Sequence, residues 1–498
     1  MRKKSIGPLI LICWIIFGFP TCRNLSGQSL NEVKSDTIFI SYPDGLRFEI
    51  PQKHSYHQTL TMKLFMSQAM FDGKFKRKDN GKSELFLTCE MALDAIRRID
   101  NLTLGIPKII YLVGWQYNGH DSKYPAWFEG NDAIKRPQDA SAIESIKWLM
   151  KEASKYNTTV SLHLNMFDAY EDSPLFEQYV KNDIIARNQD GTLRACEWGY
   201  PVSYAREWAT GYSQKRIDSI CRIFPLEKSG TVHIDAFHSW PPVPVADGKG
   251  GYRIDLICCP ISPFLRNTVE DETEAQQNIF RYWASKSIDV TSEGVDFLRE
   301  TAFEGFQPMA WWFGGGLRYY LKWPASYYSG GQDNSDWGKL FGTSIHGEDI
   351  VRNDYEHLTG FKEAFCLKTV IWYFLNRLDR LYVVNTKDFK TVGFSSDVKT
   401  FLSYGQYRVT NGARILAENE DIFIPALWIN TKSIIAYSKC GYENKTWTLP
   451  EDWSAVNSVR LCTVNDTGRE ELGIIKINSG KITLTVKKDQ MILIESKD

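Results

Sequence analysis

Four segments in the first two-thirds of the chain end in polar or ionisable side chains directly after short apolar runs. The runs close near Trp115, Asn165, Asp235 and Glu293. Asp235 and Glu293 stand directly at the ends of their runs rather than in loops. A pair of carboxylates can hydrolyse a glycosidic bond: one attacks or stabilises the anomeric carbon, and the other protonates the leaving oxygen and then activates water. Glycoside hydrolysis is therefore the chemistry that this pattern favours.

The two-residue period of a strand sharpens this prediction. His163 and Asn165 share one face of their run, as do His233 and Asp235, while the residues between them are apolar. Each residue also has a simpler interpretation: an Asp at a strand end often caps a helix, a buried His is usually a hydrogen-bonded core residue, and a Glu after a strand is commonly solvated. Because all four endings would meet on one face, a site is favoured.

The elements that must position these residues alternate between short apolar runs and longer amphipathic segments. Strands are predicted at 108–113, 158–165, 231–235 and 288–292, and helices at 140–156, 206–224 and 270–286. Such alternation predicts parallel strands covered by helices. No glycine-rich phosphate loop follows a strand, which disfavours a nucleotide-binding doubly wound sheet. The fold predicted for residues 85–390 is a (β/α)8 TIM-like barrel, whose active sites lie at the carboxyl ends of the strands.

Both flanks of this region have β-like patterns. A small N-terminal β segment is predicted over 29–84, with short runs at 37–41 and 46–50. An antiparallel β-sandwich is predicted over 391–498. Its runs lie at 422–429, 433–437 and 481–486, and Pro425 within the first indicates an edge strand or a bulge.

The first 28 residues have the pattern of a signal peptide. Three basic residues at 2–4 precede an apolar stretch at 6–19 that is short for a membrane span. We expect the protein to be secreted, periplasmic or at the cell surface. Lipid anchoring through Cys22 is an alternative, but residues 18–21 lack the small side chains that usually precede a lipidated cysteine. No later run resembles a transmembrane helix.

Composition excludes some partners and leaves others open. A net charge of −1 shows no excess of positive charge that would favour binding to nucleic acid. The 16 Trp, 24 Tyr and 27 Phe suit stacking on sugar rings, although large β-rich enzymes also use aromatics in their cores. The cysteines lack zinc-site spacing. Hydrolysis by a pair of carboxylates requires no metal, so neither a metal nor a cofactor is expected. Cys440–Cys462 is the favoured disulfide among several pairings, and buried free thiols explain the cysteines equally well.

At these same positions the chain resembles glycoside hydrolase family 101, the endo-α-N-acetylgalactosaminidases. Residues 114–122 read GWQYNGHDS and resemble the GWQxEGHDS segment of that family. The stretch from His163 to Tyr170 resembles its HxNxxExYP run, and Trp198 falls where the family has a tryptophan-rich wall. Residues 232–235 and 289–293 resemble the strands that carry its nucleophile and its acid/base.

The resemblance implies retaining hydrolysis of N-acetylgalactosamine α-linked to Ser or Thr, as in mucin-type O-glycans. Asp235 would be the nucleophile and Glu293 the acid/base. His120 and Asp121 would hold sugar hydroxyls. The whole implied substrate-binding set is Trp115, His120, Asp121, His163, Asn165 (assisting at the reacting ring), Asp168, Trp198 (a wall of the site) and His233. The partner would be a carbohydrate or a glycoprotein.

The chain also departs from the family pattern. AFHSW follows Asp235 in place of a VWGN-like continuation, Glu293 lacks the usual Trp-Gly-His, and Asp168 replaces a longer acidic residue. The chain is shorter than the multi-domain endo-enzymes, and exo-acting relatives such as family 129 fit its length. Two alternatives stay open: an exo α-galactosidase-type hydrolase acting on another glycan, and a catalytically inactive sugar-binding surface protein.

Overall fold

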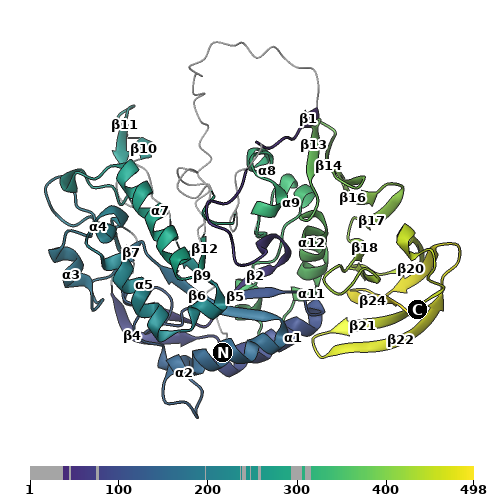
Figure 1. The fold of residues 1–498 in the computed structure, drawn as a ribbon, viewed down its shortest axis with the longest axis horizontal. Coiled ribbons are helices and arrows are strands. Elements are labelled where there is room, and N and C mark those ends of the chain that lie inside the picture. The colour runs from purple at the N-terminus through teal and green to yellow at the C-terminus, as the bar shows by residue number, and fades with distance from the viewer. Residues whose placement is uncertain are drawn as a thin grey trace, which may run out of the picture. The chain divides into compact units, whose positions relative to one another are not determined.

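The computed structural model describes residues 37–43, 46–73, 78–196, 198–235, 237, 243–246, 248–255, 259–292, 305–308, 316–331 and 333–497. The expected signal peptide and Glu293 lie outside these residues. All described elements belong to one compact unit, Thr37–Asp498 (Figure 1). Within the described ranges, no helix is long and apolar enough to cross a membrane.

A five-stranded parallel sheet forms the centre of the first half of the chain. Its order is β12-β9-β6-β5-β2, and every neighbouring pair runs parallel. The bounds are β2 (Leu60–Phe65), β5 (Lys108–Val113), β6 (Thr158–Asn165), β9 (Thr231–Asp235) and β12 (Asp289–Ser292). Side chains on both faces of these strands are buried, which explains their largely continuous apolar runs. The prediction of a mixed α/β fold is confirmed.

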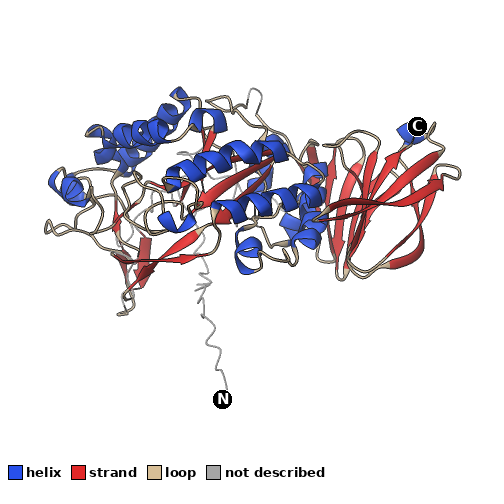
Figure 2. Ribbon diagram, turned by 90° about the horizontal axis from the view of Figure 1, so that it is seen from below, coloured by secondary structure: helices blue, strands red, loops and turns tan. Residues whose placement is uncertain are grey.

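Helices lie between these strands along the chain. Figure 2 shows helices (blue) beside the strands (red). They are α1 (Cys89–Thr103), α2 (Ala142–Ala153), α3 (Phe176–Lys181), α4 (Tyr204–Ala209), α5 (Tyr212–Ile223), α6 (Leu226–Ser229) and α7 (Val269–Ser285). The helix expected over 206–224 is wrong in one respect. Gly211, with φ of 77°, separates α4 from α5, because this left-handed conformation interrupts a helix and suits glycine.

The predicted N-terminal β segment is not a separate unit. Its β2 is a strand of the parallel sheet, and β1 (Thr37–Phe39) pairs with a strand of the C-terminal sheet. A hairpin follows β2, formed by β3 (Ser67–Phe71) and β4 (Asp79–Leu85). Residues 46–50 form no strand. The local sequence pattern indicated extended segments in this region, but the strands with which they pair lie further along the chain.

The C-terminal part is a large antiparallel sheet, of the order β1-β13-β14-β15-β16-β17-β18-β19-β24-β21-β22. The bounds are β13 (Arg380–Asn385), β14 (Phe389–Phe394), β15 (Val398–Ser403), β16 (Gln406–Asn411), β17 (Arg414–Glu418), β18 (Asp421–Pro425), β19 (Ser433–Ser438), β21 (Ser458–Asn465), β22 (Gly468–Lys476) and β24 (Gln490–Ser496). The sheet thus begins before residue 391, and β18 ends at Pro425, which lacks an N–H for the ladder.

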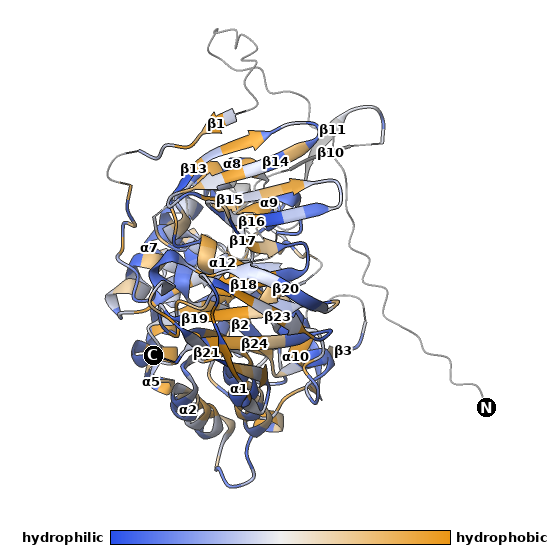
Figure 3. Ribbon diagram, turned by 90° about the vertical axis from the view of Figure 1, so that its right-hand side faces the viewer, coloured by the Kyte–Doolittle hydropathy of each residue, from blue (hydrophilic) through white to orange (hydrophobic). Residues whose placement is uncertain are grey.

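A two-stranded layer, β20 (Tyr442–Thr448) and β23 (Lys481–Val486), covers one face of this sheet. Phe423 of the large sheet stacks on Trp447 of the small layer, with ring centroids 5.2 Å apart. Figure 3 shows the middle strands β19 and β24 as largely hydrophobic, and their side chains are buried. The expected sandwich therefore has two very unequal layers.

Short helices between the two sheets complete the core. They are α8 (Leu317–Lys322), α9 (Asp336–Phe341), α10 (Glu348–Asn353), α11 (Phe361–Ala364), a π-helical turn (Phe365–Val370) and α12 (Ile371–Leu375). One hydrophobic cluster runs from the parallel sheet to the large antiparallel sheet. The two are also joined by polar contacts: the Trp428 indole donates to the Thr103 carbonyl at 3.0 Å, and Arg98 pairs with Asp466 at 2.7 Å.

The remaining pairs of short strands lie around the parallel sheet. They are β7 (Asp168–Ala169) with β8 (Tyr200–Pro201), and β10 (Val243–Ala246) with β11 (Tyr252–Asp255). The favoured disulfide of the sequence analysis is wrong. Cys440 and Cys462 are both free, the first exposed and the second buried.

Candidate active site

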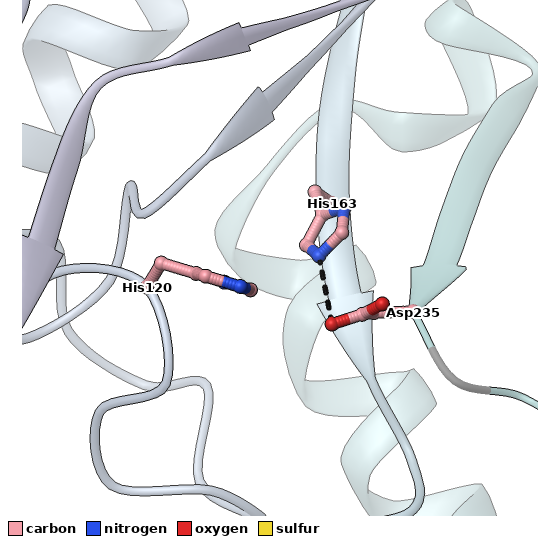
Figure 4. Close-up of side chains that lie close together, drawn as sticks. All are labelled: His120, His163 and Asp235. Carbon is pink, nitrogen blue, oxygen red and sulfur yellow. Dashed lines mark ion pairs between the residues drawn. The ribbon is translucent and has the colours of Figure 1, made fainter. Parts of the chain in front are cut away.

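The carboxyl ends of β6 and β9 bring His163 and Asp235 together. In the parallel register His163 pairs with His233 and Asn165 pairs with Asp235. The side chains of His163 and Asp235 approach diagonally across the two strands, with Nε2 of His163 3.4 Å from Oδ2 of Asp235 (Figure 4). His163 is buried, whereas 17 % of the Asp235 side chain is exposed. Asp235 therefore reaches solvent from a rigid strand end.

His120 reaches the same place from the loop that follows β5. The imidazoles of His120 and His163 meet edge to face, with centroids 5.3 Å apart. One donor atom each of His120, His163 and Asp235 lies within 4.8 Å of the other two. The neighbouring carboxylate of Asp121 is 3.5 Å from Nε2 of His120. Residues predicted from three separate segments thus form one cluster, which Figure 4 shows for the two histidines and Asp235.

The backbone of the loop over 114–122 is unusual for several residues. Gly114 and Gly119 have φ of 73° and 119°. A Cβ on Gly114 would overlap the carbonyl oxygen of Ser67, and one on Gly119 would lie 2.7 Å from the Ala69 nitrogen. Both glycines are therefore required where the loop presses on β3. Asp121 also has a positive φ, 60°, which Asp tolerates better than most residues.

Asp79 at the start of β4 anchors this loop, and sequence reasoning missed it. Its carboxylate accepts hydrogen bonds from Asn118 Nδ2 at 2.9 Å and from Ser122 Oγ at 2.6 Å. Lys123 lies 3.5 Å from the same carboxylate and 2.6 Å from Asp172. Asn118 and Ser122, at the two ends of the NGHDS stretch, thus bind the β3–β4 hairpin, and His120 between them is directed at the site. No local signal marks Asp79, because its partners lie some forty residues away in sequence.

His233 supports the site from below rather than lining it. Its ring is fully buried and stacks on His163, with centroids 5.1 Å apart and planes 28° from parallel. Its Nδ1 is hydrogen-bonded to Thr291 Oγ1 at 2.9 Å. The Tyr111 ring also lies near it, with centroids 5.4 Å apart. The expectation that His233 contacts substrate is therefore corrected: burial keeps it from a ligand, and it fixes the His163 ring.

Trp115 is also corrected from a sugar contact to a positioning residue. It is fully buried, its indole Nε1 donates to the His163 carbonyl at 2.9 Å, and its ring meets Phe224 edge to face at 5.2 Å. A buried indole without a hydrogen bond would be costly, and this bond to β6 satisfies it. Trp115 therefore holds the backbone at the residue that contacts Asp235.

Asn165 shapes the turn at the end of β6. Its Oδ1 accepts from the backbone N–H groups of Phe167 and Asp168 at 2.8 Å, and its Nδ2 donates to Asp168 Oδ2 at 2.7 Å. The guanidinium of Arg216 donates to the Asn165 carbonyl at 2.8 Å. Asn165 is fully buried. Its expected role at the sugar ring is therefore replaced by a role in orienting the carboxylate of Asp168, which is also buried.

Two buried tyrosines face the same group of acids. Burial raises the pKa values of Tyr124 and Tyr170 well above the usual range, and the nearby charges of Asp121, Asp168 and Asp235 raise them further. The two rings lie 5.8 Å apart. Both phenols therefore stay protonated at neutral pH and can donate hydrogen bonds, and three carboxylates from different segments act on them electrostatically.

Trp198 is the expected aromatic wall, and 42 % of its surface is exposed. A Cβ on the next residue, Gly199, would lie 2.7 Å from the Tyr170 ring, so the backbone beside Trp198 packs directly on that tyrosine. An exposed indole in this position can stack on a sugar. Glu197 and the predicted acid/base Glu293 lie outside the described residues.

The partly exposed carboxylate of Asp235 thus stands beside two imidazoles at the carboxyl ends of parallel strands, where active sites of barrel enzymes lie. Residues 83–253 match the sequence profile of a glycoside hydrolase family described as endo-alpha-N-acetylgalactosaminidase. The resemblance to family 101 that the sequence predicts is confirmed over this segment. The matched segment contains His120, His163 and Asp235.

Solved structures that align with this chain include glycoside hydrolases. The α-N-acetylgalactosaminidase NagBb of Bifidobacterium bifidum, in complex with GalNAc, aligns with 72 % of this chain at 12 % identity and a TM-score of 0.49. The alignment covers 59 % of that enzyme. An Anoxybacillus α-amylase aligns with 90 % of this chain and all of its own length, at 10 % identity and a TM-score of 0.40.

Proposed function

We propose that the protein is a retaining glycoside hydrolase that cleaves α-linked N-acetylgalactosamine from O-glycans or glycoconjugates. One observation carries the proposal: within the segment matched to the family, the Asp235 carboxylate stands at the end of β9, partly exposed and 3.4 Å from His163. An ionised carboxylate that is rigidly held yet accessible is what a glycosidase nucleophile requires.

In this mechanism Asp235 attacks the anomeric carbon and forms a covalent glycosyl-enzyme while the bond to the leaving oxygen breaks. Glu293 donates its proton to that oxygen, then removes a proton from the water that hydrolyses the intermediate. The neutral phenols of Tyr124 and Tyr170 are buried near Asp235 and would help to orient its carboxylate. His120 and the carboxylate of Asp121 supply further polar groups at the same place.

Two wider features belong to the same proposal. The parallel sheet would be part of a closed (β/α)8 barrel. Residues 1–28 would direct export, which would place the enzyme where extracellular glycans are found; anchoring through Cys22 is the alternative to free secretion. Among the described residues the sheet has two ends, at β12 and β2.

The test compares aryl α-GalNAc, aryl α-galactoside and a serine-linked Gal-GalNAc disaccharide as substrates. We expect the aryl α-GalNAc to be cleaved fastest, with an α-configured first product by NMR. Asp235→Asn should lower kcat by roughly a thousandfold or more, whereas Asp190→Asn, on an exposed loop, should not. Azide should rescue Glu293→Ala as the α-glycosyl azide and Asp235→Ala as the β-azide.

Other outcomes would replace this proposal. Unchanged turnover in Asp235→Asn would remove the nucleophile assignment. A β-configured first product would exclude retention. Faster cleavage of the aryl α-galactoside would indicate an exo α-galactosidase-type enzyme. Binding of GalNAc without turnover of any substrate would indicate a sugar-binding protein, an interpretation that the departures around Asp235 and Glu293 favour as the second candidate.

A further inference from the structure

We propose that His120, His163 and Asp235 form a binding site for a zinc ion, and that zinc bound there blocks the candidate active site. The binding itself does not depend on the proposed function. Only the consequence, competition with a sugar for Asp235, rests on it.

The spacing of the three side chains suits a single metal ion. Two ligands of tetrahedral zinc, each at about 2.1 Å, lie about 3.4 Å apart. His163 Nε2 and Asp235 Oδ2 are separated by 3.4 Å. The donor atom of His120 lies within 4.8 Å of both. A shift of His120 by about one ångström would therefore complete three ligand positions.

The ligand set selects the class of metal. Imidazole suits zinc, copper, iron and nickel, whereas calcium and magnesium require mostly oxygen ligands. Two histidines and one carboxylate with a fourth position open to water is the composition of many zinc sites. The side chains of His120 and Asp235 are 16 % and 17 % exposed, so an ion and its water can reach them.

The surroundings hold the ligands in place, as a metal site requires. His163 is fixed by its stacking on His233 and by the Trp115 hydrogen bond to its carbonyl. His120 packs edge-on against Phe65 with centroids 5.4 Å apart, and its Nε2 lies 3.5 Å from the carboxylate of Asp121. Two ligands lie on rigid strands and the third on a loop, so the loop supplies the small adjustment.

A zinc ion in this site would use the oxygen of Asp235 that the proposed mechanism needs for attack on the sugar. Zinc and substrate would then exclude each other. We expect zinc to raise the apparent KM of a GalNAc substrate with no change in kcat at saturating substrate, and a chelator to reverse the effect.

Zinc binding is measured on the mature chain, prepared without purification histidines, by isothermal titration and by competition with a chromophoric chelator. We expect one ion per chain with a micromolar or lower Kd. His120→Gln and His163→Gln should weaken binding at least tenfold. His357→Gln serves as the control, because its side chain is 75 % exposed and lies in another segment. Cobalt in place of zinc should give intense visible bands near tetrahedral values, and His120→Gln should abolish them.

Two further variants keep the proposal falsifiable. His163 is buried and its variant can lose structure, so His120→Gln, on the partly exposed loop, decides the outcome together with a circular dichroism spectrum that matches wild type. Cys440→Ser removes the exposed thiol. Equal zinc affinity in His120→Gln, or loss of binding in Cys440→Ser alone, would overturn the proposal.

The binding and activity assays separate the two proposals. Zinc bound through His120 in a protein that hydrolyses no glycoside would support the metal site and contradict the proposed function. If the protein hydrolyses the glycoside, zinc does not change the rate and the titration detects no bound ion, the proposed function is supported and the metal site is contradicted.

Discussion

The hydroxyl of Ser122 donates a hydrogen bond to Oδ2 of Asp79 at 2.6 Å, and this contact joins the loop after β5 to the β3–β4 hairpin. Asn118, four residues earlier, binds the other oxygen of the same carboxylate. The stretch that resembles the family motif is therefore held at both ends by a residue outside it. His120 lies between these two attachment points, so its position at the site depends on Asp79.

Ser122→Ala should loosen this loop. The variant removes one donor from a buried carboxylate, which costs about 1–3 kcal/mol of unfolding free energy. Because His120 and Asp121 lie in this loop and would move with it, we also expect a higher KM for a GalNAc substrate. Urea unfolding and steady-state kinetics measure the two effects. Ser454→Ala, at an exposed position of the C-terminal part, is the control. Equal stability of both variants would contradict the anchoring role.

Gly114→Ala should destabilise the fold far more than Gly405→Ala. Both glycines have φ near +70°, so each alanine carries the left-handed penalty of about 1–2 kcal/mol. Only the Cβ at 114 would also overlap the Ser67 carbonyl, which adds about 1–3 kcal/mol or more; nothing lies within 4 Å of a Cβ at 405. Thermal unfolding of the two variants checks the difference, and similar melting temperatures would show that the loop relaxes freely.

Arg216→Met should cost about 3–5 kcal/mol of unfolding free energy, because it leaves the buried carboxylate of Glu207 without its cation. The two groups are 2.6 Å apart with almost no exposure. Adding Glu207→Gln should recover part of the loss. The surface pair of Arg97 with Asp94 provides the comparison: Arg97→Met should cost less than about 1 kcal/mol. Chemical denaturation of all variants gives a double-mutant cycle, and full additivity would contradict the pairing.

The stability of the protein should depend on pH through Glu272. Burial raises its pKa to about 7, although Ser203, the Tyr204 N–H and Asn267 hydrogen-bond to the carboxyl. The folded state thus binds the proton more tightly than the unfolded state, whose pKa is near 4.5. The stability contributed by this proton is fully present below about pH 4.5 and is lost as pH rises through about 7, a change of about 3 kcal/mol.

Unfolding in urea between pH 4.5 and pH 8 measures this dependence. Glu272→Gln cannot titrate, so the difference in unfolding free energy between wild type and this variant should change across that window. Glu274→Gln, exposed on the same helix, should follow the wild-type profile. Parallel profiles for wild type and Glu272→Gln would contradict the assignment.

Local pattern predicted several elements well. The strands expected at 108–113, 158–165, 231–235 and 481–486 have the same bounds in the structure. Each is an apolar or alternating run between turn residues, and such runs depend on few distant contacts. The sequence did not predict that Gly211 separates two helices. Apolar residues at helical spacing on both sides of a glycine are compatible with one helix or with two.

Pairing between distant segments could not be predicted in the same way. β2 joins the parallel sheet beside β5, and β1 adds to the edge of the C-terminal sheet at β13. Strand periodicity states which face is buried but not which strand lies alongside. The predicted N-terminal β segment failed for this reason, and the same limit left the unequal size of the two sandwich layers unpredicted.

The sequence by itself indicated that His163 and Asp235 lie at strand ends and face one direction, because strand period and turn signals are local. It placed His120 in the segment that follows the strand at 108–113. It could not separate residues that reach solvent from those that support them. Trp115, Asn165 and His233 have the residue types of a sugar site, yet packing across β5, β6 and β9 buries all three. Only the tertiary structure showed that these three residues position the site and that Asp79 anchors the loop over 114–122. Burial and hydrogen-bond partners are set by neighbours far away along the chain.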